Sequence, residues 1–93
     1  MTNTLDIITD DEIRDVAFRA VAWSRKMAQE RKEIISAATG YHWVDMERAF
    51  GRFRYAHAQY TKQWKTAARR GYFDEEHDAT WNAALDEAKE SAS

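Results

Sequence analysis

Basic and aromatic side chains recur between residues 48 and 70 at a spacing that places them on one side of a helix. The members of this basic stripe are Arg48, Arg52, Tyr55, Lys62, Arg69 and Arg70. Arginine and lysine at helical spacing can follow the phosphates of a nucleic acid, and a tyrosine can stack on a base. The same charges could instead steer an acidic protein partner, or simply form a solvated helix face.

A second candidate contact is the aromatic cluster Tyr41, His42 and Trp43, which follows Gly40. Tyrosine and tryptophan are frequent binding hot spots where they are exposed. The alternative is that Trp43 closes the end of the core as a first-turn residue. The sequence leaves both interpretations open.

Two polar residues interrupt apolar helix faces without indicating catalysis. A lone histidine such as His57 is most often a core residue with one hydrogen-bond partner, for which Ser24 is a candidate. Glu30 is expected to pair with Arg52 or Arg54 rather than to act as a general base.

The remaining reactive residues do not form a catalytic or metal-binding pattern. Asp74 and His77 make a single carboxylate-x-x-His pair, whereas a helical di-iron site needs two such pairs and further glutamates. The chain has no cysteine, and its three glycines are too scattered for a phosphate-binding loop. We therefore expect no enzymatic activity, no metal and no cofactor.

Composition limits the elements that can position these residues. The 93 residues include no proline and only three glycines, which predicts one all-α domain over residues 1–93 with short connections. No leader-like segment and no apolar stretch of roughly 20 residues occurs, so we expect a cytoplasmic protein that does not bind a membrane.

The net charge of −2 conceals an uneven distribution along the chain. Residues 1–40 carry a charge of −1, residues 41–72 carry +5, and residues 73–93 carry −6. The acidic end could dock on a basic partner, or it could neutralise the basic stripe within the folded chain.

The first helix is expected over residues 10–39. Thr9 and Glu12 form a capping box, and Ile8 and Ile13 flank it as a hydrophobic staple. Gly40 is expected to end the helix in the left-handed conformation. The core stripe is predicted to consist of Ile13, Val16, Ala20, Trp23, Met27, Ile34 and Ala37.

A second helix is expected over residues 41–70, before Gly71, and a third over residues 74–90 with Asp74 as its N-cap. The predicted apolar seam of the second helix is Met46, Phe50, Phe53, His57, Tyr60, Trp64 and Ala67. The short apolar stripe of the third helix is Trp81, Ala84, Leu85 and Ala88.

These elements predict a long antiparallel helical hairpin with a shorter third helix, which makes a three-helix bundle. Residues whose numbers sum to about 81 should face each other across the hairpin. The third helix is too short to cover the hairpin and should leave apolar surface exposed near Gly40, open to a second copy of the chain.

The sequence favours a small non-enzymatic interaction protein that binds another protein or protein complex through its helix faces. It could act as an adaptor, an inhibitor or a component of an assembly, and its composition is typical of phage and mobile-element accessory proteins. The basic stripe is the first expected binding surface, and Tyr41 and Trp43 are the second. Nucleic-acid binding through the stripe, or self-association into a homo-oligomer, are the alternatives.

Overall fold

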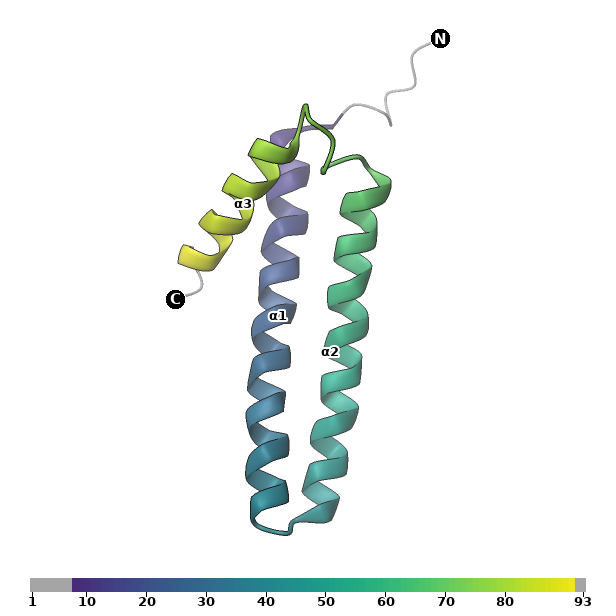
Figure 1. Ribbon diagram of the computed structural model, residues 1–93, viewed down its shortest axis with the longest axis vertical. Helices are drawn as coiled ribbons and strands as arrows, with labels where there is room; N and C mark the ends of the chain where they lie inside the picture. Colours follow the sequence, from purple (N-terminus) through teal and green to yellow (C-terminus); the bar gives the residue numbers. More distant parts are fainter. Residues whose placement is uncertain (1–7, 92–93) are drawn as a thin grey trace.

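Two long helices run antiparallel, and a shorter third helix lies beside the first (Figure 1). The computed structural model describes residues 8–91, in which α1 spans Asp10–Thr39, α2 spans Trp43–Arg69 and α3 spans Asp78–Ser91. No strand occurs in this part of the chain. The predicted all-α fold with three helices is confirmed.

The three helices form an elongated bundle rather than a compact one. α1 packs against both α2 and α3, whereas the backbones of α2 and α3 do not approach each other within the described residues. The molecule measures 60 × 27 × 17 Å, and its radius of gyration is 16.7 Å. A compact domain of this length would have a radius of gyration of about 12 Å. Both broad faces of the hairpin are therefore open to solvent over much of their length.

The start of α1 is fixed by its predicted cap and by the end of α2. The backbone N–H of Glu12 donates to Oγ1 of Thr9 at 3.2 Å, and Ile8 packs on the core cluster that contains Ile13. The carboxylate of Glu12 accepts a hydrogen bond from Arg70 at 2.9 Å. One residue thus joins the beginning of α1 to the end of the hairpin's second helix.

The turn between α1 and α2 does not use its glycine as predicted. Gly40 has a φ of −88°, and Tyr41 takes the left-handed conformation with a φ of 58°. Tyr41 donates its N–H to the carbonyl of Ala38 at 3.1 Å, and His42 donates to that of Ala37 at 2.8 Å. This pair of bonds is a Schellman motif, in which the left-handed residue is the one after the C-cap. Gly40 is one position too early to fill that place.

The end of α2 has the same motif with a glycine in the left-handed position. Gly71 has a φ of 79°, and Tyr72 donates its N–H to the carbonyl of Ala67 at 2.9 Å. The chain then needs a further turn, in which His77 and Asp78 donate to the carbonyl of Asp74. The third helix therefore begins at Asp78 and not at Asp74, because the intervening loop returns Tyr72 to the core.

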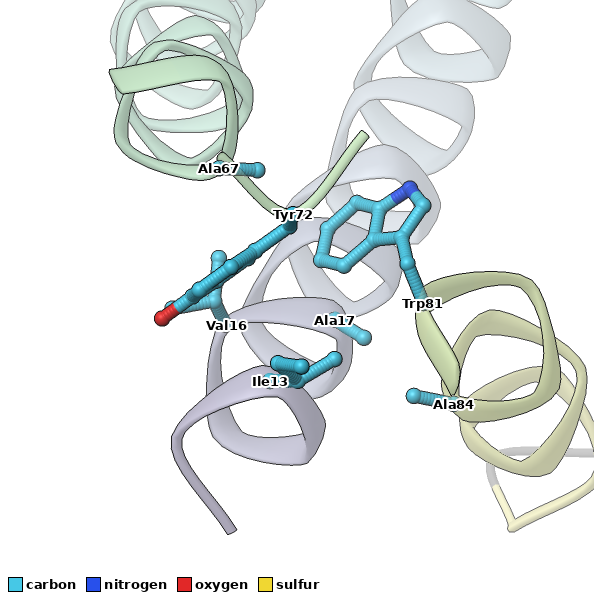
Figure 2. Close-up of a cluster of buried hydrophobic side chains, with 7 residues drawn as sticks. All are labelled: Ile13, Val16, Ala17, Ala67, Tyr72, Trp81 and Ala84. Atoms are coloured by element: carbon cyan, nitrogen blue, oxygen red, sulfur yellow. The ribbon is translucent and has the colours of Figure 1, made fainter. Parts of the chain in front are cut away.

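The main core lies at the end of the hairpin that carries α3 (Figure 2). Tyr72 comes from the loop and Trp81 from α3, and both are 2% exposed. Trp64 completes this core from α2, with its ring 5.3 Å from Trp81 and 5.6 Å from Phe73. The buried cluster consists of Ile13, Val16, Ala17, Ala67, Tyr72, Trp81 and Ala84.

The seam of α2 differs from the predicted one. Its buried residues are Ala49, Ala56, Gln63 and Ala67. Phe50 and His57 are exposed beside this seam, and His57 stacks on Phe53 with 6.4 Å between the ring centroids. Small side chains at the centre let two helices approach closely, and larger side chains then pack along the edge of the contact. The prediction that His57 is a core residue is wrong, and its candidate partner Ser24 is exposed as well.

Candidate interaction surfaces

Because the buried seam of α2 differs from the predicted one, α2 is rotated about its axis relative to the prediction. This rotation divides the predicted basic stripe into two groups. Arg52 and Arg70 turn towards α1 and form ion pairs with it. Arg48, Lys62 and Arg69 remain exposed. Part of the stripe therefore lies at the edge of the contact between α1 and α2, and the rest is exposed to solvent.

Arg52 covers a buried carboxylate. Glu30 is 3% exposed, and its Oε2 atom lies 2.5 Å from Nε of Arg52. Lys26 contributes a second cation, with Nζ 3.5 Å from Oε1 of Glu30. The predicted pairing of Glu30 is confirmed, and it gives Arg52 a structural role.

Arg70 ties the end of α2 to the start of α1. Its hydrogen bond to Glu12, together with a second one to Tyr72, raises the pKa of the Arg70 guanidinium. The charge on Arg70 is thus used within the fold, where it holds Glu12. A partner that bound Arg70 would have to compete with this contact.

The contact-edge part of the stripe borders a groove between α1 and α2, which we call the basic groove. Its volume is about 550 Å³. Trp23 and Tyr55 form an edge-to-face pair across it, with 5.6 Å between ring centroids, and Tyr55 is 61% exposed. The groove is lined by Trp23, Lys26, Arg48, Gly51, Arg52 and Tyr55. The sequence analysis did not predict that Trp23 and Lys26 of α1 line this surface, although the hairpin register could have placed Trp23 near Tyr55.

Gly51 occupies an unusual position in the basic groove. It lies inside α2, and a Cβ atom built on it would meet no atom within 4 Å. Glycine within a helix costs about 1 kcal/mol relative to alanine. The fold does not need a glycine here for packing. The glycine therefore leaves open space in the basic groove that a side chain could have filled.

The hairpin tip exposes aromatic side chains. Tyr41 is 74% exposed and Trp43 is 55% exposed, with their rings edge to face at 5.7 Å. The structure places Trp43 outside the core, and Val44 beside it is also exposed. Nearby, His42 lies 3.8 Å from the carboxylate of Asp45.

The other broad face of the hairpin carries an apolar surface near the same end, which we call the apolar flank. It consists of Met27, Ala28 and Ile35 from α1 with Phe50 and Phe53 from α2. A groove of about 510 Å³ lies between the two helices here, and Arg31 and Lys32 form its rim. The third helix lies beside the N-terminal half of α1 and ends before this surface (Figure 1). The predicted exposure of apolar surface near Gly40 is confirmed.

The described residues add two observations about function class. Within residues 8–91, no helix has the length and apolar character that a membrane span requires. In the same range, no three histidine or carboxylate side chains come together as metal ligands would.

Comparison of the chain with family models, with curated proteins and with solved structures finds no match.

Proposed function

We propose that this chain is a small non-enzymatic interaction protein that binds a protein or protein complex through the tip and the basic groove of its hairpin. The observation that carries this proposal is where large apolar side chains are exposed. Eight of them are exposed in the described residues, and four of these lie at the tip or in the basic groove, namely Tyr41, Trp43, Val44 and Tyr55. Such a concentration is typical of a contact surface, since scattered single residues are normal on any protein.

The conformation of Tyr41 supports this choice of surface. A tyrosine with a positive φ costs about 1–2 kcal/mol relative to an unstrained residue, and strained residues often cluster at functional sites. Glycine or asparagine would form the same turn without this cost. A ring that is 74% exposed at a strained position contributes little to the core, which favours a role in contact with a partner.

The basic groove would supply orientation and speed of association. Arg48 and Lys26 lie beside the exposed ring of Tyr55 and the half-buried ring of Trp23. Cations around an aromatic anchor steer an acidic partner to the surface, and the desolvated ring then provides affinity. The protein would act as an adaptor, an inhibitor or an assembly component of a phage or mobile element, in the cytoplasm.

Nucleic-acid binding is the second candidate function. It is favoured by Arg48, Lys62 and Arg69, which are exposed along α2. Real nucleic-acid binders of this size are usually basic overall, whereas this chain has a sequence pI near 5.9.

The proposal is tested by affinity capture from cells that naturally produce the chain. We expect the wild-type protein to retain a specific protein, and a Tyr41→Ala/Trp43→Ala variant to lose it. Phe18→Ala is the control, because Phe18, at 53%, is about as exposed as Trp43, at 55%, but lies far from the tip on α1. Equal capture by the wild type and the tip variant would contradict the tip assignment.

A further inference from the structure

The tip half of the hairpin has almost no core of its own. At about 1.5 Å per residue, the 14 residues of α3 cover roughly half of the 30-residue α1. Between residues 23 and 60 the only buried hydrophobic residues are Ala49 and Ala56. Several of the larger apolar side chains there lie on the apolar flank, where Ile35 is 57% exposed and Phe50 is 38% exposed. A second layer on this face would bury them.

Charge is also unbalanced between the two ends of the molecule. The apolar flank is rimmed by Arg31 and Lys32, and the tip half, residues 25–56, carries seven basic and four acidic side chains, a charge of +3. The opposite half, residues 8–24 and 57–91 with α3, carries seven basic and eleven acidic side chains, a charge of −4. The ion pair of Glu87 on α3 runs to Arg14 of α1, and the backbones of α2 and α3 stay apart. The acidic helix therefore does not cover the basic tip half within one chain.

We propose that two copies of the chain associate as an antiparallel two-fold dimer through the broad faces that carry their apolar flanks, with the two-fold axis near the middle of each face. Reversing one copy places its acidic α3 half beside the basic tip half of the other, at both ends of the interface. The same face then serves both copies, as a two-fold interface requires, and the flank of each copy is covered by the α3 half of the other. This proposal goes beyond the proposed function, because the tip and the basic groove remain outside the interface.

The size of the face is sufficient for such a dimer. A stable interface buries roughly 800 Å² of surface on each partner, and the broad face of the molecule measures 60 by 27 Å. The interface would hold two apolar contacts, one at each flank, with complementary charges around them, and apolar contacts within a polar surround are typical of specific complexes. A second copy of the chain supplies both the apolar surface and the complementary charges, so no other partner is needed.

The test is sedimentation equilibrium of the full chain from about 1 to 200 µM, a range that brackets the micromolar affinities of modest interfaces. We expect a species of twice the 10.9 kDa chain mass. Its dissociation constant should rise roughly tenfold between low and high salt, because the end contacts are electrostatic. A monomer at every concentration, or an assembly that grows beyond the dimer, would overturn the proposal.

Single substitutions identify the surface. We expect Phe50→Glu and Ile35→Glu each to raise the dissociation constant by about 100-fold or more, since each places a charge in a desolvated apolar contact. Val44→Glu is the control, because Val44 is 62% exposed on the opposite side of α2 and should leave the dimer intact. Circular dichroism verifies that each variant folds. A dimer that survives both flank substitutions, or that is lost in Val44→Glu, would refute the assigned surface.

A charge exchange tests the orientation. Lys32→Glu alone and Asp86→Lys alone should each weaken the dimer, and the double variant should recover it, because in an antiparallel pair the acidic α3 half that contains Asp86 lies beside the basic tip half that contains Lys32. In a parallel dimer each half would face its own copy, so like charges would meet in the wild type already and the double variant would restore no attraction. Failure of the dimer would leave the proposed partner binding intact, since that is measured separately by capture at the tip.

Discussion

The guanidinium of Arg52 closes over the carboxylate of Glu30, with 2.5 Å between Nε and Oε2. The Glu30 side chain is 4% exposed, whereas that of Arg52 is 50% exposed. One partner is therefore inside the hairpin and the other forms its surface. Removing the two partners should have unequal consequences.

Arg52→Ala should destabilise the fold by about 1–3 kcal/mol, because it leaves a buried carboxylate with Lys26 as its remaining cation. Glu30→Leu should cost less or even stabilise, since apolar residues often replace a buried ion pair without loss. Urea denaturation of the two variants measures the difference. An Arg52→Ala variant as stable as the wild type would show that the pair contributes nothing.

The sequence was sufficient to predict the hairpin and its register. The contacts Glu30–Arg52 and Glu12–Arg70 join residues whose numbers each sum to 82, close to the predicted value. The α1 stripe could be recognised because it contains large apolar residues such as Ile13 and Val16 at regular spacing. Large buried side chains give the strongest periodic signal.

The seam of α2 could not be predicted in the same way. Its centre is made by Ala49 and Ala56, which carry little hydrophobic weight beside Phe50 and His57. A close helix contact selects small residues, and the aromatic residues that dominate the pattern lie at its edge. This shift of one residue is also why Arg52 was expected on the outer face and is found against α1.

The left-handed residue of the first Schellman motif is Tyr41, and a glycine at this position should relieve its backbone strain. Tyr41→Gly should be more stable than Tyr41→Ala by about 1 kcal/mol, because only glycine takes the left-handed conformation without strain. Both variants delete the ring and should lose partner capture equally. Thermal unfolding compares the stabilities, and equal stability of the two variants would mean that the turn is not strained.

The glycines of α2 and of the following loop should differ in the same experiment. Gly51→Ala should stabilise the fold by about 0.5–1 kcal/mol, because a Cβ there meets nothing within 4 Å. Gly71→Ala should destabilise it by about 1 kcal/mol or more, because its φ is 79° and the new Cβ would lie 2.8 Å from Oδ2 of Asp74. A partner that approaches α2 closely at the basic groove would bind Gly51→Ala less well despite its greater stability. Unchanged capture by this variant would place the partner elsewhere.

The exposed cations decide between the two candidate functions. Arg48, Lys62 and Arg69 are the members of the basic stripe for which the described residues show no ion pair. If nucleic acid binds, fluorescence anisotropy of labelled DNA and RNA should show affinity that falls steeply with salt, and alanine at all three positions should flatten that dependence by about three phosphate contacts. Under the protein-binding proposal we expect no nucleic-acid binding even at low salt, and slower association with the captured protein in the triple variant. Arg52→Ala and Arg70→Ala do not serve this comparison, because each breaks an ion pair with α1 and changes the fold's stability together with its charge.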